Sequence, residues 1–193
     1  MARAEVEAVR DALLPLCGAL HEAFARADRT RRERLPELAG DPLYRWHTTH
    51  TIRAYAHHAL SRADLGPWKL SGNHAHNGEL WLTDSVYEVR VLHASADNDV
   101  PGPTGRLVYG EVMLPMSPPL FGPSNNRLLV LWRVSDAGAP KFRVVRPVGE
   151  WRFGGTQQTD LDFVLPPDAA ELRAAVIELA DDNLELLLPA EEA

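Results

Sequence analysis

The sequence has little cysteine and no long apolar run, and we expect that its first residues are not a secretory signal. Its 193 residues include one cysteine, Cys17, so no disulfide can form within the chain. A single thiol is consistent with a reducing compartment, and we expect a soluble, cytoplasmic protein. No apolar stretch approaches the roughly 20 residues that cross a bilayer, so we expect no membrane-spanning segment. The acidic residues Glu5, Glu7 and Asp11 lie where a secretory signal needs an apolar core.

The compact motifs of several enzyme classes are also missing. The chain contains no GxxxxGK[S/T] loop, no GxGxxG turn, no GxSxG elbow and no CxxC pair. A nucleotide-binding loop or a serine-hydrolase elbow therefore has no support in the sequence. Because dispersed residues can also catalyse reactions, these absences leave open whether the chain is an enzyme.

Negative charge is concentrated at the C-terminal end. The formal net charge is -7, and the segment 166–193 alone carries eight acidic residues and one basic residue, Arg173. Residues 1–165 are therefore neutral overall. Duplex DNA would repel the acidic segment, which argues against general nucleic-acid binding.

Apolar periodicity predicts helices in the first third of the chain. Residues 1–40 form a helical segment with one apolar stripe, and Pro15 and Gly18 predict a kink or break within it. Asp41 is a suitable N-cap, and the proline that follows it suits the first turn, so a second helix is predicted over 41–63. The stripe of the first segment consists of Val6, Val9, Leu13, Leu16, Leu20 and Phe24.

From Trp68 onward the apolar period changes from that of a helix to that of a strand. Turn-rich segments separate the candidate strands, and no long helical pattern lies between them, so we expect an antiparallel meander of hairpins. The candidate strands are 68–72, 79–83, 86–94, 106–114, 127–135, 141–148 and 161–165.

The chain ends with a third helical pattern. Asp168 and Glu171 have capping-box spacing, and Leu172, Val176 and Leu179 form the apolar stripe. The prediction is a single α+β domain with a mainly antiparallel sheet of about six to seven strands. Its parts are an N-terminal helical segment (1–40), a histidine-bearing helix (41–63), the sheet (68–165) and an acidic C-terminal helix and tail (166–193).

Six of the eight histidines lie between residues 47 and 76. On a helix, those of the 41–63 segment lie opposite its aliphatic face. Two pairs have spacings that could share one ion, at i,i+3 on the helix and at i,i+2 in an extended segment, and Glu79 could add a carboxylate ligand. The candidate metal ligands are His47, His50, His74 and His76, for zinc or another divalent transition metal.

The spacing of these histidines matches no specific metal signature. The helical pair lacks the glutamate and the four-residue spacing of HExxH. A solvated or pocket-lining histidine face is therefore the favoured interpretation, and we expect no cofactor.

A second candidate site is a basic face of the predicted sheet. Alternation places its basic side chains opposite the core-facing residues of the strands 127–135 and 141–148. These side chains could bind an anionic ligand or partner, or could meet the acidic C-terminal segment of the same chain, which we favour. The residues are Arg127, Arg133, Lys141 and Arg143.

The sequence thus predicts a cytoplasmic binding or interaction protein without catalysis of its own. Its partner would be another protein or a small anionic ligand, and it could form a homo-oligomer. The alternative is a small metal-dependent hydrolase, in which a histidine-held ion activates a water and Glu79 is a ligand or general base.

Overall fold

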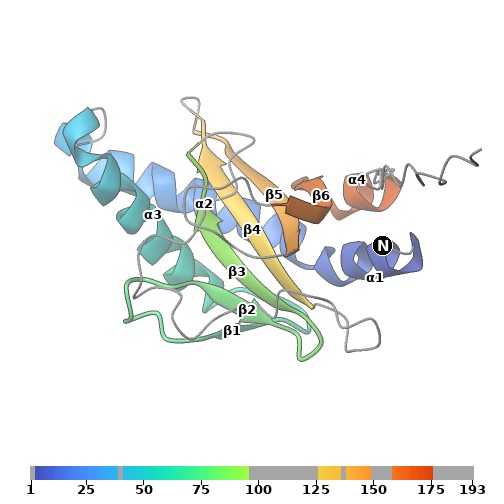
Figure 1. The fold of residues 1–193 in the computed structure, drawn as a ribbon. Helices are drawn as coiled ribbons and strands as arrows, with labels where there is room; N and C mark the ends of the chain where they lie inside the picture. Colours follow the sequence, from blue (N-terminus) through green and yellow to red (C-terminus); the bar gives the residue numbers. More distant parts are fainter. Residues whose placement is uncertain (1–2, 39–40, 96–125, 136–137, 149–157, 176–193) are drawn as a thin grey trace, which may run out of the picture.

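The structure is a computed structural model that describes residues 3–38, 41–95, 126–135, 138–148 and 158–175 (Figure 1). Helices pack on one side of a single six-stranded sheet, which confirms the predicted α+β class. The helices are α1 (Arg3–Leu13), α2 (Leu16–Arg34), η1 (Pro36–Leu38), η2 (Pro42–Tyr44), α3 (Arg45–Leu60) and α4 (Ala169–Ala174). The strands are β1 (Lys69–Ser71), β2 (Trp81–Thr83), β3 (Glu88–His93), β4 (Arg127–Val134), β5 (Pro140–Val148) and β6 (Gln158–Leu165).

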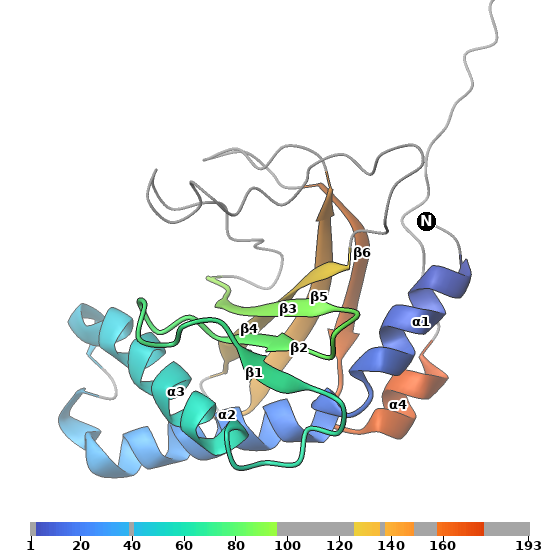
Figure 2. The same cartoon turned by 90° about the horizontal axis from the view of Figure 1, so that it is seen from below.

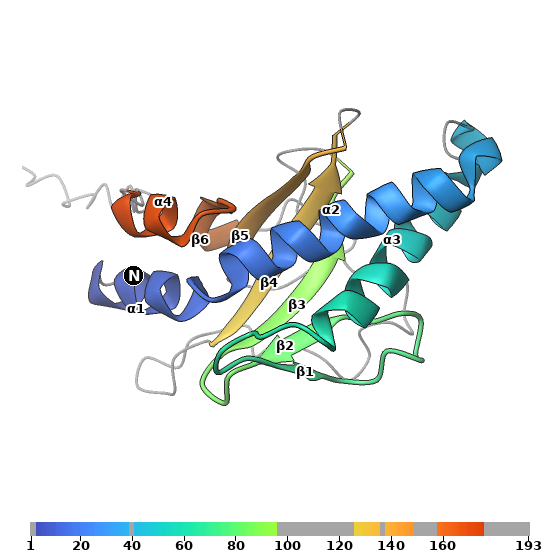
Figure 3. The same cartoon turned by 180° about the vertical axis from the view of Figure 1, so that it is seen from behind.

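The N-terminal helical segment breaks where the sequence predicts. α1 ends at Leu13 and α2 begins at Leu16, with Pro15 at the N-cap. Proline lacks the N–H that would continue the helical hydrogen bonds, so the chain turns here while its apolar stripe stays on one side. Leu20 and Phe24 continue that stripe and are fully buried. α2 then crosses the sheet beside α3 (Figure 3).

The histidine-bearing helix is shorter than the predicted segment 41–63. The Asp41 carboxylate accepts a hydrogen bond from the backbone N–H of Leu43 at 2.9 Å, which confirms the N-cap. The cap opens the 3-10 turn η2, and the α-helix proper, α3, follows it and ends at Leu60. Ile52 and Leu60 are buried against the rest of the molecule, so the aliphatic face points inward as expected. No helix among the described residues is long and apolar enough to cross a membrane.

The strands follow one another in chain order from β1 to β6, but they are not a pure meander. β3 and β4 pair in parallel, with Val91 opposite Val130, whereas the other neighbours pair antiparallel. The predicted meander is wrong at this point. A parallel pair needs a crossover of a dozen or more residues, and the 33 residues between His93 and Arg127 provide the length. The predicted strand 106–114 lies outside the described residues.

The middle of the sheet is buried on both faces. On the helix-covered face, Val130 and Trp132 of β4 join the main core with Val144 of β5. On the opposite face, Leu129 and Leu131 form a second buried cluster, which also contains Ala94, Val145 and the partly buried Leu92. The nearly continuous apolar sequence of β4 is typical of a strand that is buried on both faces. The basic residues at its two ends therefore flank an apolar patch.

The last described helix lies beside α1 at one end of the molecule (Figures 2 and 3). The Asp168 carboxylate accepts a hydrogen bond from the backbone N–H of Ala170 at 2.7 Å, as its N-cap role predicts. Leu172 is fully buried, so α4 is docked on the core. Val176 and Leu179, the other predicted packing residues, lie outside the described part of the chain.

Candidate functional site

The predicted histidine face does meet the β1–β2 turn, but through a different pair of residues. The ring of His57 on α3 stacks on the ring of His74, with centroids 3.7 Å apart and an angle of 13° between the planes. Burial lowers the pKa of His57, and the neighbouring imidazoles of His74 and His58 lower it further. In stacked rings the nitrogens point sideways rather than toward a shared point, so this contact packs the turn onto the helix.

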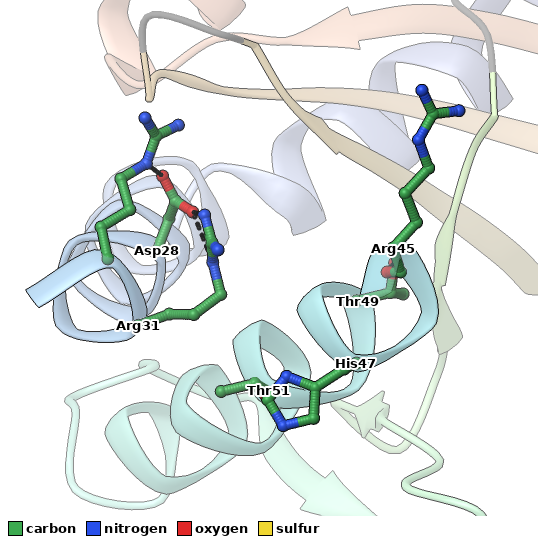
Figure 4. Close-up of polar contacts among 7 residues, drawn as sticks. Asp28, Arg31, Arg45, His47, Thr49 and Thr51 are labelled. Carbon is green, nitrogen blue, oxygen red and sulfur yellow. Dashed lines mark hydrogen bonds and ion pairs between the residues drawn. The ribbon is translucent and has the colours of Figure 1, made fainter. Parts of the chain in front are cut away.

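The two predicted helical ligands are held by their own helix. The Nδ1 atom of His50 accepts a hydrogen bond from Arg53 at 3.0 Å. His47 lies 3.5 Å from the hydroxyl of Thr51 (Figure 4). The rings of both histidines pack against Trp46, at 5.6 Å and 6.3 Å between centroids.

The two predicted ligands on the turn are also occupied locally. The Nδ1–H of His74 donates to the backbone carbonyl of Glu79 at 2.8 Å. His76 is largely exposed, and its Nδ1 lies 3.5 Å from the Glu79 carboxylate. That carboxylate also lies 3.8 Å from the guanidinium of Arg90 and accepts a hydrogen bond from the indole N–H of Trp81 at 3.2 Å. Glu79 is therefore the negative group of this turn.

In the described part of the chain, no three histidine, cysteine, aspartate or glutamate side chains form a group that could hold a metal ion. The predicted histidines thus lie in one region without a common focus. The zinc hypothesis stays a prediction, because a zinc site in a protein needs three or four ligands around one point.

An arginine, which the sequence reasoning missed, clamps the turn to α3. The guanidinium of Arg53 donates to the backbone carbonyl of Asn77 at 2.9 Å. Gly78 has a φ of 65°, and a Cβ added there would lie 3.1 Å from the Arg53 guanidinium. Burial lowers the pKa of Arg53, the charge of Arg90 lowers it further, and Glu79 opposes both. A glycine in this turn was the available signal, because it allows a positive φ and a close approach.

A cavity among the described residues lies elsewhere, at the end of the sheet where β5 begins and β6 ends. We call it the corner pocket, and its volume is about 730 Å³. Leu131, Phe163, Val164 and the two prolines after β6 provide apolar wall, and His21 reaches it from α2. Its charged lining residues are Arg133, Lys141, Arg143, Asp162 and Glu171.

Three of the four predicted basic residues therefore line one cavity. Arg143 forms a bidentate pair with Asp162 on β6, and this hydrogen bonding raises the pKa of the guanidinium. Lys141 is exposed at the start of β5. Arg127 does not line the pocket, because it lies at the opposite end of β4 and pairs with Glu88 at 3.3 Å. The predicted basic face thus separates into three residues that line the corner pocket and one remote ion pair.

His21, which the sequence reasoning did not select, belongs to this corner. Its Nε2–H donates to the carbonyl of Leu165 at 2.8 Å, and its ring packs edge-on against Phe142 with centroids 4.8 Å apart. Burial lowers the pKa of His21, and the hydrogen bond to Leu165 partly opposes that shift. Nothing in the local sequence of α2 distinguishes this histidine, since its partner is 144 residues away.

Two other charged groups hold the scaffold together. On α2, the carboxylate of Asp28 binds Arg31 at 2.8 Å and Arg32 at 2.7 Å, and both Asp28 and Arg31 are buried (Figure 4). The second group is on β5, where the guanidinium of Arg146 lies between two carboxylates. It is 2.6 Å from that of Asp160 and 2.5 Å from that of Glu5 on α1. Burial disfavours the charge of Arg146, but these hydrogen bonds outweigh it and raise its pKa. These partners explain the buried charges structurally.

No protein-family model matches this chain, and comparisons with curated proteins and with solved structures also find no match. What the protein binds must therefore be argued from the geometry of its own surface.

Proposed function

We propose that the protein is a binding module without catalysis of its own, and that its corner pocket takes an acidic segment of a partner protein. The observation that supports this most is the combination of lining residues. Apolar wall from Leu131, Phe163 and Val164 lies beside the cationic groups of Arg133 and Lys141. A peptide segment that carries both aliphatic and acidic side chains matches that combination.

The size and exposure of the pocket are compatible with a short peptide segment. A volume of about 730 Å³ lies within the range of roughly 300–1,000 Å³ that ligand pockets occupy. Val164 is 68% exposed, which is a high value for a valine on a sheet strand. Covering this side chain and its neighbours would give the apolar part of the binding energy. The cationic groups would select the sign of the partner's charge and speed its association.

The charge arrangement indicates which groups would meet the ligand. Asp162 is engaged by Arg143, so this pair contributes little net charge to the corner. Arg133 and Lys141 are the other cationic residues that line the pocket, and Glu171 is its other acidic lining residue. An acidic segment would therefore bind nearer to Arg133 and Lys141 than to α4.

No specific observation favours the metal-dependent hydrolase. Such an enzyme commonly holds its ion with three protein ligands, and the described residues contain no group of three such side chains. That alternative stays a prediction, to be tested by elemental analysis of the purified protein.

The binding proposal can be tested with a fluorescent peptide of alternating glutamate and leucine, by anisotropy at low salt. The variants Lys141→Glu and Arg133→Glu should each weaken binding about tenfold or more, since each replaces an attraction by a repulsion. Lys69→Glu is the matched control, because Lys69 is also an exposed lysine but lies on β1, at the opposite edge of the sheet. Equal affinities for all three variants and the parent chain would refute the proposal.

A further inference from the structure

The chain itself carries a segment of the kind that the corner pocket would take. The 18 residues that follow Ala175 include six acidic residues and no basic residue. Aliphatic side chains are interspersed among them, which gives the segment both the charge and the apolar surface that the pocket would complement. The acidic residues are Glu178, Asp181, Asp182, Glu185, Glu191 and Glu192.

Chain continuity brings the start of this segment to the pocket. Glu171 on α4 lines the pocket, and Ala175 follows it by four residues, about one helical turn. An extended chain covers about 3.3 Å per residue, so a few residues suffice to cross the cavity. A tethered segment also has a local concentration on the order of millimolar, which favours it over a free partner of similar affinity.

The charges that face the pocket agree with this occupant. Arg133 and Lys141 would attract the acidic side chains, and Asp162 is already engaged by Arg143. Glu171 is the opposing charge, and it lies on the helix from which the segment leaves. The acidic residues further along the segment would therefore bind at the far side of the pocket, next to β4 and β5.

We propose that the C-terminal segment 176–193 docks in the corner pocket of its own chain and competes there with the partner. The docking stands on the pocket and on the charges of the segment, whereas the competition rests on the proposed function. The segment would act as an internal competitor that lowers the apparent affinity for any acidic ligand.

Engineered cysteines in the full-length chain test the docking. Val164→Cys in the pocket wall would be combined with Leu186→Cys in the segment, and disulfide formation would be followed on non-reducing gels and by mass. The native thiol should not take part in disulfide formation at neutral pH, because Cys17 is buried and burial raises its pKa to about 11. Val86→Cys with Leu186→Cys is the control, since Val86 is also an exposed valine, at 60%, but lies in the turn before β3.

We expect the Val164 pair to form an intramolecular disulfide at least about tenfold faster than the control pair, as a docked segment has the higher local concentration at the pocket. Adding Asp181→Lys and Asp182→Lys should remove most of that difference. Equal rates for the two pairs, or a cross-link found only between two chains, would overturn docking within one chain.

The peptide assay separates this inference from the proposed function. In the full-length chain with Asp181→Lys and Asp182→Lys, the glutamate–leucine peptide should bind about tenfold more tightly than in the parent chain. Peptide binding that is unchanged by these substitutions, together with equal cross-linking rates, would overturn the docking while leaving the proposed function in place. A fast Val164 cross-link with no peptide binding to either chain would confirm the docking but refute the proposed function and the competition.

Discussion

The histidine face and the corner pocket are assembled in opposite ways. Residues 47–79 bring six histidines close together in the sequence, yet His47, His50 and His74 contact polar groups of their own helix or turn. The corner pocket draws on α2, β4, β5, β6 and α4, and no short stretch of sequence contains more than a part of it. A high density of one residue type along the chain thus did not produce a cavity among the described residues, whereas dispersed residues did.

Shape explains the difference between the two regions. The turn before β2 lies directly on α3, with Gly78 against Arg53 and the ring of His74 on that of His57, so the side chains fill the space between them. At the corner, β6 ends at Leu165 and two prolines lead the chain away toward α4, and a hollow remains beside the start of β5. The end of β6 therefore leaves a cavity at the corner, whereas the turn before β2 is packed against α3.

The largest expected effect concerns the helix that borders the corner pocket. Leu172→Asp should lower the free energy of unfolding by about 3–5 kcal/mol, because it places a charge at a fully buried position. Ala170→Asp, at an exposed position of the same helix, is the control and should change stability little. Thermal or chemical denaturation measures both. An unchanged midpoint for Leu172→Asp would show that α4 is not docked in solution.

A smaller effect is expected at the histidine face, where a glycine holds the turn. Gly78→Ala should cost about 1–2 kcal/mol, because alanine is strained at a φ of 65° and its Cβ would lie 3.1 Å from the Arg53 guanidinium. Gly18→Ala should act in the opposite sense and stabilise by up to about 1 kcal/mol. It lies within α2, where an added Cβ would be in ordinary contact, at 3.8 Å, with the Pro167 carbonyl. Denaturation midpoints that shift in the same direction for both variants would contradict the prediction that the two substitutions have opposite effects.

Much of the fold could be predicted from the sequence because local signals determine it. The proline between α1 and α2, the Asp41 and Asp168 caps and the alternating strands each act within a few residues. The parallel pairing of β3 with β4 could not be predicted in this way, since pairing direction depends on how a long connection returns to the sheet.

The candidate site was predictable only in part, for the same reason. Strand alternation placed Arg133, Lys141 and Arg143 on one face, and three of the four predicted basic residues do line the corner pocket. His21 and Glu171 were missed, because their place in the pocket comes from packing across the whole chain. The cluster of histidines was conspicuous in the sequence, but helix geometry alone could not show that His57, rather than His50, would meet the turn.

The pH dependence of stability should report on the corner pocket through His21. Burial lowers its pKa in the folded chain, whereas the unfolded value is about 6.5. The unfolded state therefore binds more protons as the pH falls through that value, so the contribution of His21 to stability is present above pH ~6.5 and is lost below it. The difference in unfolding free energy between the parent chain and His21→Gln should shrink as the pH is lowered from 8 toward the folded pKa. A difference that grows over that range would mean that His21 is stabilised in its charged form.

The smallest expected effect is the removal of a single histidine from the histidine face. His50→Ala deletes the acceptor of one exposed hydrogen bond from Arg53, whose guanidinium keeps its bond to the Asn77 carbonyl. Exposed polar contacts of this kind contribute little, so the unfolding free energy should change by less than about 0.5 kcal/mol.

The same variant tests the zinc hypothesis, because two imidazoles hold an ion much more weakly than three or four ligands do. We expect elemental analysis to find well below one zinc per chain in both the parent and the variant. One zinc per parent chain that is lost in His50→Ala, with the fold intact, would instead mean that the histidines converge on an ion. The histidine face would then be the metal-binding site of the protein, and the corner pocket would be the less important of the two regions.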